Sequence, residues 1–168
     1  GALANDVAYL LGNAVYGATR TLVINSLLAI CGSRFGRGLI RVGGVVFDID
    51  ADMIRQIKTT LEKVRYDVIL MSETMFSTPT VLARFEQTGI VDTEKARQIG
   101  LVGPAGRASG VLLDVRSDHP FGMYRYSPIH KMTMLSGDVF ARAYIRFIEI
   151  QQSLKIIREL LAEESEGI

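Results

Sequence analysis

The sequence is poor in the residues that bind metals or form disulfides. Its 168 residues include one cysteine, Cys31, no tryptophan and two histidines, His119 and His130. One thiol cannot form an internal disulfide, a CxxC redox pair or a multi-cysteine metal site, and it is compatible with a reducing compartment. The two histidines match no metal-ligand spacing. We therefore expect this chain to bind no metal by itself.

The sequence also lacks an excess of charge of either sign. Lys and Arg number 19 and Asp and Glu number 18, so the formal net charge is +1. Such a balance gives no field that would steer the chain to nucleic acid, and we expect no nucleic-acid partner. No charged segment followed by an apolar run and a cleavage site opens the sequence, so we expect no signal peptide. The length favours a single domain over residues 1–168.

Acidic residues are missing from one long stretch. Residues 7–47 contain no Asp or Glu but four arginines: Arg20, Arg34, Arg37 and Arg41. Arginine is the preferred cation for buried and interfacial ion pairs, because its planar guanidinium binds carboxylates in a bidentate way. These arginines therefore need carboxylates from outside the stretch.

The first part of this acid-free stretch is strongly apolar. Between residues 7 and 30 the only charged side chain is that of Arg20. A run of this length raises the alternative of a transmembrane helix. A central arginine costs about 2.5–3.5 kcal/mol in a bilayer. We therefore favour a helix buried on most sides inside a bundle, ended by Gly32 as a C-cap.

The rest of the chain predicts a mainly α fold. Apolar residues at spacings of three and four predict a helix over 50–76, and shorter helices are expected over 80–87 and 92–99. The five glycines between 32 and 44 favour a tight β-hairpin or an extended loop that runs into residues 45–47, and 111–115 is a candidate short strand. A last helix is expected from Ser136 or Asp138 to about residue 162. The predicted architecture is a helical bundle with a small β-hairpin and a long, glycine-rich ordered loop over residues 100–128.

Chemistry-bearing residues gather in this loop. The segment GPAGRASG at 103–110 fits neither a phosphate loop nor the GxGxxG fingerprint. Within and just beyond it, however, stand Arg107, Asp114 and Arg116, and two guanidinium groups around one carboxylate make a rigid polar cluster. We expect an ordered, at least partly buried cluster that either pins the loop or lines a pocket. On the last helix, Arg142, Arg146 and Glu149 share one face, for which a solvated Arg–Glu pair remains the simpler interpretation.

Several ordered motifs together resemble a known superfamily. They are GPAGRASG at 103–110, DVR at 114–116, PFGMY at 120–124, GDVFARAYIRFIEIQQS at 137–153, GSR at 32–34, RVGGV at 41–45 and DVA at 6–8. This order and spacing resemble the large subunit of membrane-bound, energy-converting [NiFe]-hydrogenases of the formate hydrogenlyase type. They equally resemble the related quinone-site large subunit of respiratory complex I, the NADH-quinone oxidoreductase. Residues 31–41 look more similar to the hydrogenase branch.

The family's metal motifs are absent. Its hydrogenases bind nickel and iron through two cysteine pairs, R-x-C-G-x-C and D-P-C-x-x-C, and neither occurs here. Two explanations stay open. The chain is a central fragment of such a subunit, as its abrupt start suggests, with a NiFe centre in the parent; or the parent is a metal-free, hydrogenase-like structural adaptor. In either case we expect the isolated fragment to be inactive.

The resemblance implies partners and site residues. The parent would lie peripherally on the cytoplasmic side of the membrane, docked on an iron–sulfur small subunit and membrane-arm subunits, and would couple electron transfer to ion movement. Quinone is the substrate in the complex I relatives. The implied quinone or proton-network candidates are Asp6, Arg34, Arg107, Asp114 and Arg116. The implied subunit-interface candidates are Arg37, Arg41, Arg142, Arg146 and Glu149. Without those partners, a first helix that is apolar almost all round predicts that the isolated chain forms a homo-oligomer. The alternative is that this helix folds back into its own core and the chain stays monomeric.

Overall fold

The computed structural model describes the backbone of residues 1–166 and the side chains of residues 1–162. The chain divides into two compact units: Gly1–Glu73 with Ile157–Ile168, and Thr74–Ile156. The expectation of a single domain over residues 1–168 stays a prediction.

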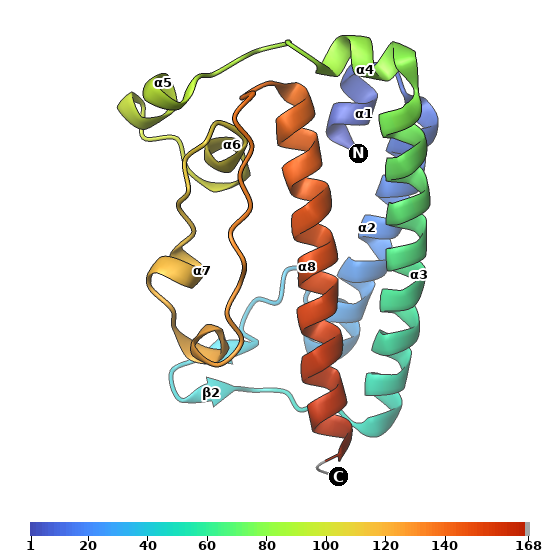
Figure 1. The fold of residues 1–168 in the computed structure, drawn as a ribbon. Helices are drawn as coiled ribbons and strands as arrows, with labels where there is room; N and C mark the ends of the chain where they lie inside the picture. The colour runs from blue at the N-terminus through green and yellow to red at the C-terminus, as the bar shows by residue number, and fades with distance from the viewer. Residues whose placement is uncertain (167–168) are drawn as a thin grey trace. The chain divides into compact units, whose positions relative to one another are not determined.

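The first unit is built on two antiparallel helices. A short α1 (Ala2–Asp6) leads into α2 (Leu10–Cys31), and α3 (Ala51–Ser77) runs back alongside α2 (Figure 1). The hydroxyls of Tyr16, early in α2, and Ser72, late in α3, share a hydrogen bond of 2.8 Å. The apolar stripe of α3 is buried as its spacing predicted, with Ile54, Leu61, Val64, Val68 and Met71 in this unit.

The expectation that α2 is buried on most sides is wrong. Only Gly12 and Thr19 of its 22 residues are buried, and Leu10 and Leu28 are 66% and 41% exposed. By length and composition alone α2 could cross a membrane, a test that core helices of soluble proteins also pass. The hydrophobic pattern of a helix predicts that its surface is shielded from water. It does not predict that the shielding residues belong to the same segment of chain.

The segment between α2 and α3 forms the predicted hairpin. Gly32 ends α2 in the left-handed conformation with a φ of 68°. Strands β1 (Ile40–Arg41) and β2 (Gly44–Val45) then pair antiparallel, with Ile40 opposite Val45. Both strands are exposed, so the hairpin stands away from the core of its unit.

The second unit contains the short helices and most of the last long helix. In order they are α4 (Pro79–Phe85), α5 (Thr93–Gln98), α6 (Gly103–Ala108), α7 (Val115–Asp118), the 3-10 helix η1 (Gly122–Arg125) and α8 (Val139–Glu166). The prediction of a short strand over 111–115 is wrong. Its residues connect α6 to α7, because Asp114 caps the start of α7 instead of continuing an extended run.

Two backbones cross closely where α8 begins. Asp138 caps α8 by accepting from the amide of Ala141, and it also accepts from the amide of Gln87 at 3.0 Å. The preceding Gly137 has a φ of 60°, and a Cβ there would lie 2.0 Å from the carbonyl oxygen of Val91. Only glycine fits this crossing. The segment over 87–91 is thereby fastened to the start of α8.

The predicted fold class is confirmed. The described residues are mainly helical, with one two-stranded antiparallel sheet and a loop ordered by short helices.

The exposed face of α2 generates the first prediction. Because a monomer rarely leaves so large an apolar face in water, we expect the isolated chain to self-associate at micromolar concentration. Light scattering coupled to size exclusion measures this directly. A mass of one chain that does not change with concentration would contradict it.

Candidate functional site

The centre of the candidate site is Arg107, a charged side chain that is only 5% exposed. It lies near the end of α6. Its Nε donates to Glu149 Oε1 at 2.6 Å, and Nη2 lies 2.5 Å from the same oxygen. On the other side, Nη1 donates to the carbonyl of Leu113 at 3.1 Å and lies 3.3 Å from Asp114 Oδ2. Burial of an unpaired guanidinium would be very costly, so both carboxylates are needed to hold Arg107 inside the unit.

Asp114 joins Arg107 to a second arginine. Its carboxylate receives Arg116 Nε at 2.9 Å and Arg116 Nη2 at 2.7 Å, a bidentate pair, and it also accepts from the amide of Arg116. The hydrogen bond from the Arg116 side chain outweighs burial and holds the pKa of Asp114 below its ordinary value. The same hydrogen bond raises the pKa of Arg116. Both groups are therefore charged at neutral pH.

The four side chains form a line of alternating charge. From Glu149 on α8 through Arg107 and Asp114 to Arg116, the formal charges are −, +, − and +, which sum to zero. Asp114 and Arg107 are almost fully buried, while the Glu149 and Arg116 side chains at the two ends are 19% and 29% exposed. The line, which we call the four-residue network, thus links two partly accessible ends through a buried middle.

Neighbouring contacts hold the loop around this network. The amide of Asp114 donates to Asp118 Oδ2, and Asp118 is ion-paired with Lys131. The hydroxyl of Ser117 donates to the carbonyl of Ile129 at 2.6 Å, and the amide of Met134 donates to the carbonyl of Arg107. The hydrogen bond from Lys131 lowers the pKa of Asp118. Polar contacts therefore hold this loop, since apolar side chains such as Leu112, Val115 and Phe121 are exposed.

The structure confirms the predicted cluster of Arg107, Asp114 and Arg116 as ordered and largely buried. Sequence reasoning missed that Glu149 completes it. Glu149 is 42 positions from Arg107, so spacing along the chain gives no sign of the pairing. The functional role given to these residues stays a prediction.

The other candidates lie apart from this network. Arg142 is engaged inside the second unit, where Nη1 donates to the carbonyls of Gly137 and Gly89. Arg146 is exposed and bonds the carbonyl of Arg142. In the first unit, the following candidates are exposed: Asp6, Arg34, Arg37 and Arg41. None of these four forms an ion pair with a residue whose side chain the structure describes, so they remain available to a partner.

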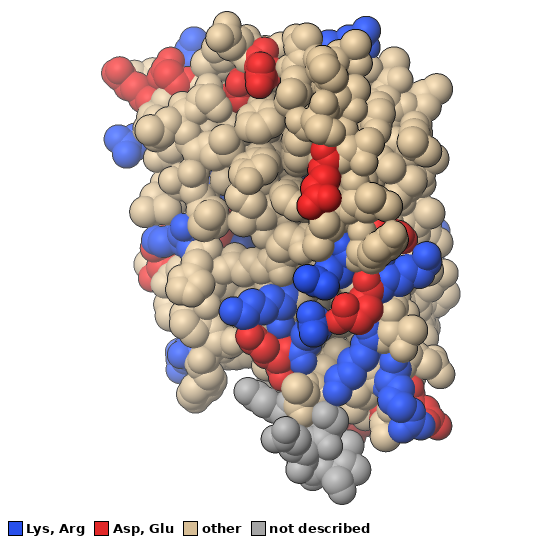
Figure 2. All heavy atoms as spheres, turned by 45° about the vertical axis from the view of Figure 1, so that its right-hand side comes forward, with Lys and Arg blue, Asp and Glu red and all other residues tan. Residues whose placement is uncertain are grey.

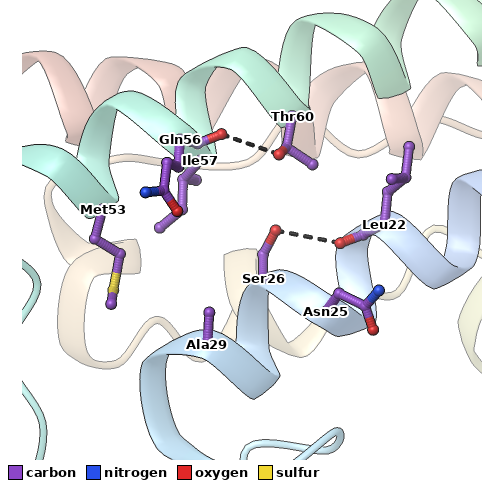
Figure 3. A pocket seen from close by; sticks show the side chains of 8 residues that line it. All are labelled: Leu22, Asn25, Ser26, Ala29, Met53, Gln56, Ile57 and Thr60. Atoms are coloured by element: carbon purple, nitrogen blue, oxygen red, sulfur yellow. Dashed lines mark hydrogen bonds between the residues drawn. The ribbon is translucent and has the colours of Figure 1, made fainter.

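A small hollow lies between α2 and α3 in the first unit (Figure 3). It holds about 180 Å³. The hydroxyls of Ser26 and Thr60 donate to carbonyls of their own helices, whereas the exposed carboxamides of Asn25 and Gln56 bond no other described residue. With no charged group among its lining residues, this hollow suits only a small neutral group.

On the side that Figure 2 presents, Lys and Arg lie among Asp and Glu. In the first unit the charges of α3 pair with one another, as in Asp52 with Arg55 and Lys63 with Asp67. Such exposed pairs contribute at most about 1 kcal/mol each. These pairs contribute to solubility, and their charges cancel instead of attracting a charged ligand.

The described residues do not suit a nickel–iron centre. They include no group of three or more His, Cys, Asp or Glu side chains placed to hold a metal ion. Cys31 is half-buried at the end of α2, where its thiol donates to the carbonyl of Leu27. A nickel–iron centre needs several thiolates, so no chemical step is assigned to such a centre in this chain.

The protein has a helical fold with a buried four-residue network, which is built from the motifs over 103–116 and 137–153. Comparison with known proteins identifies the family that has these features. The family described as "Respiratory-chain NADH dehydrogenase, 49 Kd subunit" matches residues 8–168. The chain therefore belongs to this family.

The similar proteins are subunits of respiratory complexes. The D subunit of the NADH-quinone oxidoreductase of Clostridium beijerinckii is 33% identical over 153 residues, 88% of this chain and 40% of the relative. The same subunit of Desulforamulus reducens is 29% identical over 99% of this chain and 46% of its own length. A chain from the structure of the membrane-bound sulfane sulfur reductase, an archaeal respiratory membrane complex, superposes with a TM-score of 0.86 at 28% identity.

The match is partial in one direction. The archaeal chain is covered over 43% of its length, while 96% of this chain is matched. The present chain thus spans less than half the length of these three relatives. They are named as quinone or sulfur reductases, so they lend no support to the closer likeness of residues 31–41 to the hydrogenase branch.

Removal of the shared carboxylate should be costly. We expect Asp114→Ala to lower the free energy of unfolding by about 3–5 kcal/mol, because it leaves two guanidinium groups near a single remaining acid. Urea denaturation of the purified chain measures the loss. The control is Glu94→Ala on the exposed surface of α5, which should cost less than about 1 kcal/mol. Equal losses would contradict a buried network.

The pH dependence follows from the lowered pKa of Asp114. A carboxyl whose pKa is lower in the folded state stabilises the fold above its ordinary value of about 3.9, and this stabilisation is lost as the pH falls through the lower folded value. We expect part of the acid destabilisation below about pH 4 to vanish in Asp114→Asn. Denaturation midpoints of both proteins between pH 7 and pH 2 would show it.

Metal content gives a separate prediction. The isolated chain, with one cysteine and two histidines, should bind neither nickel nor iron in stoichiometric amount and should have no hydrogenase or dehydrogenase activity. Elemental analysis after purification and gel filtration tests this. One nickel or iron per chain would refute it.

Proposed function

We propose that this chain is the central part of the large subunit of a membrane-associated, ion-coupled oxidoreductase of the complex I and hydrogenase superfamily. The observation that carries the proposal is the family match over residues 8–168, a range that contains all four residues of the buried network. The parent would transfer electrons to a quinone, as the names of its relatives suggest, or to protons as in the hydrogenase branch. It would lie on the cytoplasmic side of the membrane.

The role that we propose for this chain is electrostatic. The buried pairing of Arg107 between Glu149 and Asp114 can change only if a charge at one end of the network changes, because an unpaired charge in the middle is too costly. Glu149 and Arg116, the accessible ends, are thus the positions at which a protonation change nearby would be felt. Asp6 and Arg34, exposed in the first unit, complete the set of proton-network or quinone-region candidates.

The proposed partners are the iron–sulfur small subunit and the membrane-arm subunits. Arg37 and Arg41 of the hairpin, together with Arg146, are exposed and suit carboxylates on such partners. Arg142 and Glu149 are less suited to that role, because their side chains already bind groups within the second unit.

The experiment compares variants in the complete, membrane-assembled complex. We expect Asp114→Asn to slow electron transfer to the terminal acceptor roughly 2–30-fold, which is the range for residues that couple distant sites. Electron transfer to an artificial acceptor such as ferricyanide, measured upstream of the terminal acceptor, should stay unchanged. Glu94→Gln, the matched surface variant, should leave both rates at the wild-type level.

Two results would decide against the proposal. An assembled Asp114→Asn complex with the full rate to the terminal acceptor would exclude a coupling role for the network. The alternative is a parent that is a metal-free, hydrogenase-like structural adaptor. It predicts a parent without nickel whose Asp114→Asn variant affects assembly alone.

A further inference from the structure

We infer that Asp118 and Lys131 form a second branch of the buried network, and that this branch positions Asp114. The inference rests on the proposed function, because it takes the four-residue network as the part of this chain that influences electron transfer. It goes further by naming two positioning residues outside that network, which give it an additional accessible end.

The branch begins at a peptide group that is hydrogen-bonded on both sides. The carbonyl of Leu113 accepts from Arg107 Nη1 at 3.1 Å. The amide of Asp114, which belongs to the same peptide group, donates to Asp118 Oδ2 at 2.8 Å. Because a peptide group is planar, neither end can turn without moving the other. The backbone therefore couples the guanidinium of Arg107 to the carboxylate of Asp118, and hydrogen bonds in such a chain strengthen one another.

The branch ends at a cation that solvent reaches. Oδ1 of Asp118 is ion-paired with Lys131, and the two side chains are 26% and 23% exposed. The hydroxyl of Ser117 donates to the carbonyl of Ile129 at 2.6 Å, so the same two segments are joined a second time. The charges alternate from Arg107 through Asp118 to Lys131, as they do along the four-residue network.

The position of Asp114 matters because one contact of the network is longer than the others. Asp114 lies 3.3 Å from Arg107, whereas the other two ion pairs are 2.5 Å and 2.7 Å long. The attraction between two charges falls as their distance grows, so a displaced Asp114 would weaken this contact first. Asp118 limits such a displacement, because it also donates its own amide to the carbonyl of Asp114 at 2.8 Å. It thus holds this residue by both backbone polar groups.

Other carboxylates of the second unit accept from backbone amides without touching the network. Asp92 caps α5 by accepting from the amide of Lys95 at 2.7 Å. The chemical bond is the same as the one between Asp118 and Asp114. The difference is that Asp114 joins two arginines of the network, whereas Lys95 joins none. Asp92 therefore provides a matched control.

The test measures electron transfer in the complete, membrane-assembled complex. Asp118→Ala removes both contacts of the carboxylate, and we expect it to slow electron transfer to the terminal acceptor roughly 2–30-fold while the rate to ferricyanide stays unchanged. Asp92→Ala should leave both rates at the wild-type level. The double variant Asp118→Ala with Asp114→Asn should be no slower than Asp114→Asn alone, because Asp118 acts through Asp114. A full terminal-acceptor rate in Asp118→Ala, or single slowings that multiply in the double variant, would overturn the inference.

Variants of Lys131 test the outer end of the branch. Lys131→Met removes the ion pair but leaves the hydrogen bond between Asp118 and the amide of Asp114. We expect it to slow electron transfer to the terminal acceptor less than Asp118→Ala does. Lys131→Arg keeps a cation beside the carboxylate and should restore the wild-type rate. Equal slowing by the Met and Arg replacements would contradict a role for the charge of Lys131.

Hydrogen exchange followed by mass spectrometry separates this inference from the proposed function. In the Asp118→Ala complex we expect faster amide exchange over residues 105–116, which include Arg107 and Asp114, but not over residues 93–98. Unchanged exchange over 105–116 would overturn the inference whatever the rates. A full rate in Asp114→Asn would instead decide against the proposed function, and the exchange would still show whether Asp118 positions the network.

Discussion

The pairing of one buried guanidinium with two carboxylates organises the second unit. Arg107 comes from a six-residue helix, Asp114 from the residue that caps α7 and Glu149 from a long helix, so the pairing joins three separate elements. The electrostatic energy gained from each ion pair is offset by the loss of hydration of its charges. The network therefore specifies one geometry more than it raises the free energy of unfolding. Every departure from it leaves a charge without a partner.

The elements that sequence reasoning predicted correctly are those whose cause is local. The stripe of α3, the glycine cap of α2 and the acidic cap of α8 each depend on residues within one or two turns. Arg107, Asp114 and Arg116 were found because they stand within ten positions of each other. Local spacing, a helix cap and a short loop each depend on neighbouring residues, so the sequence predicts them.

What sequence reasoning missed depends on distant or external partners. Glu149 reaches Arg107 across 42 positions, and Arg142 reaches the carbonyl of Gly89 across 53. No periodicity encodes such pairings. The burial of α2 was misjudged for a related reason, because an apolar helix shows the same pattern whether its cover comes from its own unit or from another element. The strand expected over 111–115 failed because Asp114 was needed as a cap and an ion-pair partner.

Gly137 shows how a missing side chain can set the position of a charged one. The crossing with Val91 fixes where α8 begins, and at a rise of 1.5 Å per residue Glu149 stands about 15 Å further along that helix. A rigid helix carries any displacement at its start to every residue beyond it. An added methyl group at Gly137 would therefore displace the start of α8, and the displacement would shift Glu149 relative to Arg107. The alignment of the buried charges therefore depends on residue 137 having only a hydrogen atom as its side chain.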